Sequence, residues 1–200
     1  MESLFGIDLV TLIKTVGLTG IVFMVFAESG LLIGFLFPGD SLLFTAGFLA
    51  SQDYLNIGIL ILTCFLAAVV GDSVGYYFGE KIGPRIFTKE DSRFFKKEYI
   101  HKAQKFYEKY GGRSIVLARF LPVVRTLVPI MAGVGKMSYP HFLFYNIFGG
   151  ALWSIGLLSL GYLLGSVIPN VDKYIIFIIG FIIVLSSFMG WLEVRKMKKD

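Results

Sequence analysis

Two arginines lie in a strongly apolar stretch, residues 119–133, which also contains Pro122 and Pro129. Arg119 and Arg125 would each cost about 3 kcal/mol or more at the centre of a bilayer, and proline removes a backbone donor and breaks a helix. Broken backbone is tolerated at membrane depth only where protein buries it or where it lines a wet cavity. We therefore expect an interrupted helix whose guanidinium groups face the inside of the protein.

Two acidic residues in the first part of the chain, Glu28 and Asp40, are the expected partners of these arginines, because they also lie in apolar sequence. Buried acids and arginines can neutralise one another, and a static ion-pair network that holds the helices together is one interpretation. The other is an anion site, in which the arginine forks and broken-helix amides hold a phosphate. The carboxylates would then exchange protons, because burial raises a carboxylate's pKa and a nearby arginine lowers it.

Other polar or helix-breaking residues also lie in apolar sequence, and we expect them to support this site. These residues are Pro38, Gly39, Asp72, Pro122 and Asn146. For Asp72 the sequence leaves two interpretations open, a contact that joins helices and a functional role. An enzyme acting on lipid phosphates would need a nucleophile with a base, or a set of metal ligands. His101 and His141 are the only histidines and Cys64 is the only cysteine, so we expect no enzyme, no catalytic residues, no metal and no cofactor.

The composition is that of a membrane protein with several spans. Of the 200 residues, 56% are hydrophobic and 16% are charged, whereas about a quarter of the residues of a soluble domain are charged. Residues 80–113 contain ten Lys and Arg against five Asp and Glu, and the basic residues recur in the C-terminal tail. Basic clusters beside apolar spans are the positive-inside signal, so we expect contacts with membrane phospholipids and none with nucleic acid.

Apolar runs over 56–78, 139–166 and 174–194 predict transmembrane helices. An amphipathic helix over about 88–111 is expected on the cytoplasmic surface. Pro38 and Pro122 each interrupt an apolar segment. Some of the resulting helical arms are too short to cross the membrane, since a spanning helix needs about 20 residues. We therefore predict two re-entrant helical hairpins that enter and leave on the same side.

An internal repeat appears when the chain is compared with itself at a shift of 86 residues. Ala46-Gly47 then matches Ala132-Gly133, and Gly75-Tyr76-x-x-Gly79 matches Gly161-Tyr162-x-x-Gly165. The predicted fold is an all-α polytopic membrane domain over residues 1–200, with repeats at about 1–80 and 112–170. Because the two spans run in opposite directions, the repeats would be inverted and the hairpins opposed, with the site between them.

The motifs that carry a family resemblance run from Glu28 through Phe37-Pro38-Gly39-Asp40-Ser41, then Gly71-Asp72-x-x-Gly75-Tyr76, and finally Arg119-Phe120-Leu121-Pro122-x-x-Arg125. Together they resemble the DedA family of bacterial membrane proteins, whose eukaryotic relatives carry the VTT domain and include lipid scramblases. The resemblance covers about residues 10–170. It implies two opposed re-entrant hairpins, an acidic pair at Glu28 and Asp40, and an arginine pair at Arg119 and Arg125. Asp40 stands where many members have Glu.

The function that the resemblance implies is the movement of undecaprenyl phosphate across the cytoplasmic membrane, driven by the proton motive force, in support of the cell envelope. Arg119 and Arg125 would then bind the phosphate head group of the anionic lipid, and Glu28 and Asp40 would carry protons. A proton-coupled ion or drug antiporter and a passive phospholipid scramblase are the alternatives. We also consider a homodimer.

Overall fold

The computed structural model describes residues 9–31, 39–86, 111–121 and 124–167. Every regular element in these residues is a helix: α1 (Leu9–Gly30), α2 (Gly39–Ser51), α3 (Ile57–Ile86), α5 (Arg113–Ala118), α6 (Val124–Val134) and α7 (Tyr139–Val167). The predicted all-α class is thereby confirmed. Several predicted features lie outside the described residues: Pro38, Pro122 and the span over 174–194. The predicted helix over 88–111 also lies outside them, except for its last residue.

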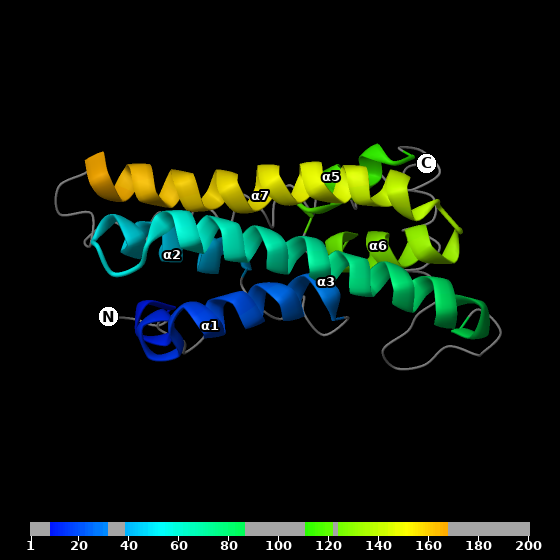
Figure 1. Ribbon diagram of the computed structural model, residues 1–200, viewed down its shortest axis with the longest axis horizontal. Coiled ribbons are helices and arrows are strands. Elements are labelled where there is room, and N and C mark those ends of the chain that lie inside the picture. Colours follow the sequence, from blue (N-terminus) through cyan, green and yellow to red (C-terminus); the bar gives the residue numbers. More distant parts are fainter. Residues whose placement is uncertain (1–8, 32–38, 87–110, 122–123, 168–200) are drawn as a thin grey trace, which may run out of the picture.

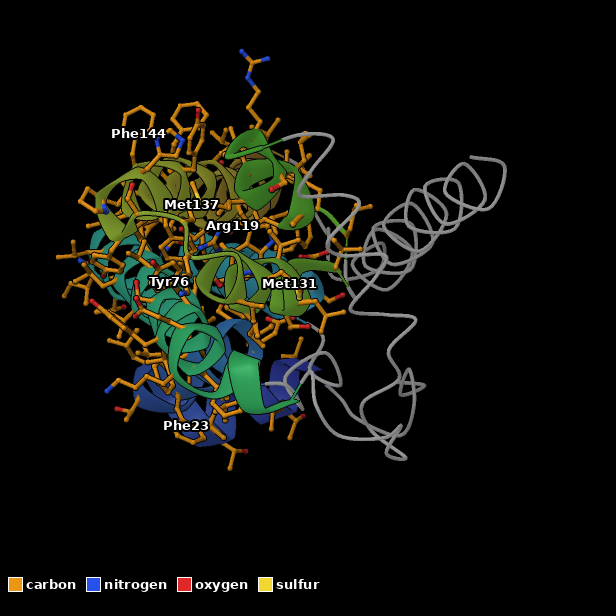
Figure 2. All side chains as sticks on the ribbon, turned by 90° about the vertical axis from the view of Figure 1, so that its right-hand side faces the viewer. Phe23, Tyr76, Arg119, Met131, Met137 and Phe144 are labelled. Atoms are coloured by element: carbon orange, nitrogen blue, oxygen red, sulfur yellow. The ribbon has the colours of Figure 1, made fainter. Side chains whose placement is uncertain are left out.

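Three of the described helices are long and apolar enough to cross a membrane: Val10–Gly30, Ile57–Lys81 and Tyr139–Val167. Apolar side chains cover their outer surfaces. Phe23 and Phe144 are 65% and 67% exposed, and in Figure 2 both point away from the bundle, whereas Arg119 lies inside it. Apolar groups outside and charged groups inside are the arrangement expected of helices in lipid.

The first long helix was not assigned as a span from the sequence, which indicated an apolar arm over residues 15–37. α1 begins earlier, at Leu9, and ends at Gly30. Its backbone is not continuously helical, because Gly17 has φ 60° and ψ −163°, a conformation that glycine adopts readily and other residues avoid. The continuous helical segment after Gly17 is therefore shorter than a full transmembrane span, which needs about 20 residues.

The interruption predicted around the arginines is present. α5 has 6 residues and ends at Ala118, and α6 has 11 residues and begins at Val124. Within α6, Pro129 has no N–H to donate to the carbonyl group of Arg125, four residues earlier. With its 13 residues, α2 is likewise shorter than a span.

Two of the short helices, α2 and α6, pack along a long helix from the other half of the chain. α2 lies along α7 and α6 lies along α3; in Figure 1, α2 is near one end of the long helices, and α5 and α6 are near the other. Glycines make both contacts close. A Cβ at Gly47 or Gly161 would overlap a backbone carbonyl across the α2–α7 contact, and a Cβ at Gly79 or Gly133 would do so across the α3–α6 contact.

The glycines of α3 differ in the space around them, which allows a matched test. A Cβ at Gly79 would overlap the carbonyl group of Ile130, whereas one at Gly75 would lie 3.6 Å from Pro129, an ordinary contact. We expect Gly79→Ala to destabilise the protein by about 1–3 kcal/mol through overpacking. Gly75→Ala should be neutral or stabilising, because alanine is the better helix former. Thermal unfolding of both variants in detergent checks this, and equal stabilities would contradict the close α3–α6 packing.

Candidate functional site

Arg125, in the first turn of α6, joins the two acids that the sequence singled out. Its Nη1 donates to Oδ1 of Asp40 on α2 at 3.1 Å, and its Nη2 forms an ion pair with Oε1 of Glu28 on α1. The side chains of Arg125 and Glu28 are 9% and 1% exposed. Three helices that are separated in the sequence thus meet at one guanidinium group, as predicted from the cost of leaving such charges unpaired.

Glu28 is also held by the start of α2. The backbone N–H of Gly39 donates to Oε1 of Glu28 at 3.0 Å, so the carboxylate lies at a helix N-terminus, where unpaired N–H groups and the helix dipole favour negative charge. A Cβ at residue 39 would overlap the carboxylate of Glu28. Glycine is therefore required at this position by the carboxylate beside it.

Arg119, just after α5, has different partners. Its Nη2 donates to Oδ2 of Asp72 on α3 at 2.5 Å and to Oδ1 of Asn146 on α7 at 2.6 Å. Asn146 is oriented by its own amide group, which donates to the carbonyl oxygen of Val69 at 2.9 Å. Arg119, Asp72 and Asn146 are all buried.

The expected pairing of both arginines with Glu28 and Asp40 is therefore correct for Arg125 and wrong for Arg119. α5 packs against α7, whereas α6 contacts α1. This packing brings Arg119 to Asn146 and to the neighbouring Asp72, and it leaves Arg125 to reach the acids of α1 and α2. Asp72 therefore contacts Arg119 directly. We call the following group of side chains the charged network: Glu28, Asp40, Asp72, Arg119, Arg125, Asn146 and Trp153.

Trp153 on α7 was not recognised as a site residue from the sequence. Its indole N–H donates to Oδ1 of Asp40 at 2.7 Å, and its ring centre lies 5.2 Å from the guanidinium carbon of Arg125 and 5.9 Å from that of Arg119. The indole therefore contacts both arginines, at cation–π distance. Its position in the middle of a span was an available signal, since tryptophan is enriched at membrane interfaces and its N–H needs a partner when buried.

A small cavity lies at the centre of the network. Ser29, Asp72, Arg119, Arg125 and Trp153 line it, and its volume is about 10 Å³. That is about the space that one water molecule requires. Both arginines thus line one cavity, as expected, but a phosphate group with its five non-hydrogen atoms does not fit.

The chain was then compared with known proteins. A family model described as VTT domain matches residues 37–163. The chain belongs to the DedA family. It is 45% identical to an uncharacterized membrane protein of Mycobacterium tuberculosis over 188 residues, 92% of this chain and 82% of that protein. It is 42% identical to protein DedA of Escherichia coli over 178 residues, covering 88% and 81% of the two chains.

A third relative is the inner membrane protein YqjA of Escherichia coli, which is 33% identical over 151 residues, 76% of this chain and 68% of YqjA. No solved structure matches the chain significantly. The chain is thus a membrane protein of the DedA family. The residues that match the VTT domain include every member of the charged network except Glu28, which precedes them.

In this DedA family protein the network has one more acid than it has arginines. If Glu28, Asp40 and Asp72 were all ionised, they would outweigh the charges of Arg119 and Arg125. Within the described part of the chain, Oε2 of Glu28 and the Nε atoms of both arginines have no hydrogen-bond partner. A buried excess of negative charge is costly, so protonation of one of these carboxylates would lower that cost.

The contact between Trp153 and Asp40 can be tested separately from the ring stacking. Trp153→Phe keeps an aromatic ring beside the arginines but removes the donor to Asp40. We expect a loss of about 1.5–3 kcal/mol in stability, because the carboxylate of Asp40 loses one hydrogen bond and keeps the one from Arg125. The unfolding transition in detergent measures it. The matched variant Phe144→Leu, on the exposed face of α7, should unfold like the wild type; an unchanged Trp153→Phe variant would contradict the assigned contact.

Proposed function

We propose that this protein carries an anionic lipid, a polyprenyl phosphate such as undecaprenyl phosphate, across the cytoplasmic membrane, and that protons drive the movement. The observation that supports this most directly is that the buried side chains of Arg119 and Arg125 line one small cavity. Guanidinium groups bind phosphate oxygens through paired hydrogen bonds, and burial strengthens such contacts. The head group would bind to these two arginines while the prenyl chain stays in lipid beside the protein.

The proposed transport path runs between two opposed re-entrant hairpins. The short helices α2 and α6, each packed on a long helix of the other half, support this topology, as does the internal repeat. Glu28 and Asp40 would exchange protons, since both are in contact with Arg125 and their protonation would weaken the ion pairs that keep the helices together. The relative YqjA of Escherichia coli is an inner membrane protein, which supports the cytoplasmic membrane as the location.

The proposed transport involves no chemical reaction. It differs from two alternative functions in its need for a proton gradient and for a phosphate group. A passive scramblase would move lipid without a proton gradient. A proton-coupled cation antiporter would use the carboxylates as its cation site and would not depend on a phosphate group. The network contains both arginines and an excess of carboxylates, so only a transport experiment separates these functions.

Reconstitution into liposomes that contain a fluorescent polyprenyl phosphate tests the proposal. We expect the wild type to move the lipid from one leaflet to the other, faster with a pH gradient than without. Arg119→Gln should lose this activity, while Arg113→Gln, at an exposed position on α5, should keep it. Equal rates with and without the gradient would indicate a scramblase, and normal movement by Arg119→Gln would contradict the head-group site.

A further inference from the structure

Asp72 differs from the other two carboxylates of the network in its relation to the cavity. Among the described residues it is the one carboxylate that lines the cavity, whereas Glu28 and Asp40 bind Arg125 and are not part of the lining. Its side chain is 5% exposed and lies 2.5 Å from Nη2 of Arg119. An anion bound to Arg119 in the cavity would therefore lie close to the negative charge of Asp72.

We propose that Asp72 is the internal counter-ion that the phosphate head group replaces on Arg119, and that proton uptake by Asp72 permits the exchange. This inference rests on the proposed function. The carboxylate and a phosphate both bind guanidinium N–H groups, so they compete for Arg119. Two anions at one guanidinium group also repel each other, and protonation of one of them removes that repulsion.

The exchange balances in charge. A proton binds to the carboxylate of Asp72, and the ion pair between Asp72 and Arg119 is lost. One negative charge of the head group then pairs with Arg119, so the number of buried unpaired charges does not rise. Release of the head group on the other side of the membrane would reverse these steps, and Asp72 would return its proton there. One proton would therefore move with each head group, which would bind as a monoanion.

Among the residues that the structure describes, no carboxylate other than Asp72 forms an ion pair with Arg119. Arg119 faces it from the end of α5, and Arg125 on α6 lines the same cavity. α1 and α2 contribute Glu28 and Asp40, both bound to Arg125. α7 contributes only the neutral side chains of Asn146 and Trp153 among its network residues. Asn146 remains bound to Arg119 when Asp72 is protonated, so the guanidinium group keeps its position.

Binding of farnesyl phosphate to the purified protein in detergent, measured by calorimetry from pH 5 to pH 9, tests the inference. We expect wild-type affinity to fall as pH rises, because only the fraction with protonated Asp72 binds; one pH unit above the midpoint the loss is about tenfold. Asp72→Asn should bind more tightly than the wild type at high pH and equally at low pH. Because both proteins are measured with the same ligand, the titration of the phosphate group affects both affinities equally and cancels in their ratio.

Two variants and two competing ligands serve as controls. Asp72→Glu keeps a titratable group and should keep the pH dependence, while Thr63→Val, on α3 but outside the network, should match the wild type. Inorganic phosphate should compete if the phosphate group is recognised, and farnesol should not. Parallel pH curves for Asp72→Asn and wild type, or weaker binding by Asp72→Asn at every pH, would overturn the role of Asp72 alone. A wild type that does not prefer farnesyl phosphate to farnesol would overturn the proposed function as well.

Discussion

Replacement of Arg125 by methionine should cause the largest loss of stability of any single substitution in the network. Arg125 is the shared partner of Glu28 and Asp40, so its removal leaves two carboxylates in the interior without their common counter-charge. Breaking a buried ion pair from one side costs about 3–5 kcal/mol. We expect a lowered unfolding temperature in detergent and no movement of polyprenyl phosphate in liposomes. Arg113→Met, at an exposed position on α5, is the matched control.

The triple variant Arg125→Met, Glu28→Gln, Asp40→Asn separates stability from function. Replacing all members of a buried charged group is often neutral or stabilising, because no unpaired charge remains. We therefore expect the triple variant to recover most of the stability lost by Arg125→Met and still to show no transport. A triple variant that both folds and transports would mean that these charges serve only to join α1, α2 and α6, and it would remove Arg125 from the proposed head-group site.

The interrupted helix between Ala118 and Val124 could be predicted because it depends on local rules. Proline in a helix interior removes a hydrogen bond and kinks or breaks the helix, and an arginine in apolar sequence is expected to face protein. The partner of Arg119 could not be predicted in this way. Glu28, Asp40 and Asp72 all lie in apolar sequence, and the choice among them depends on the packing of α5 against α7, which no sequence spacing contains.

The glycine repeat shows the same limit. The sequence match aligned Gly75 with Gly161, whereas the glycine of α3 that packs closely on a short helix is Gly79. Gly75 and Gly79 are four residues apart, which is about one turn, and they lie on the same face of α3. Sequence periodicity identifies that face correctly but cannot say which turn of it meets α6. Only the packing of the two helices decides this.

Addition of a single methyl group at Gly39 should abolish transport, although no charged residue is changed. A Cβ at this position would overlap the carboxylate of Glu28, which is bound at once by Arg125 and by the N–H group of residue 39. Since the overlapping atoms are the end of a side chain, Glu28 can turn away, but it then loses both partners. We expect Gly39→Ala to lose about 1–3 kcal/mol of stability and most of its activity in liposomes.

Two comparisons show whether the loss at Gly39 arises from Glu28. Gly156→Ala adds a methyl group to α7 at a position with no atom within 4 Å, so it should transport normally. In the Gly39→Ala protein, Glu28→Asp withdraws the carboxylate by one methylene and should restore part of the activity, because the shorter side chain avoids the added methyl group. Full activity of Gly39→Ala would contradict the placement of Glu28 at the start of α2. Loss of activity without recovery by Glu28→Asp would mean that the backbone of α2, rather than its carboxylate partner, requires the glycine.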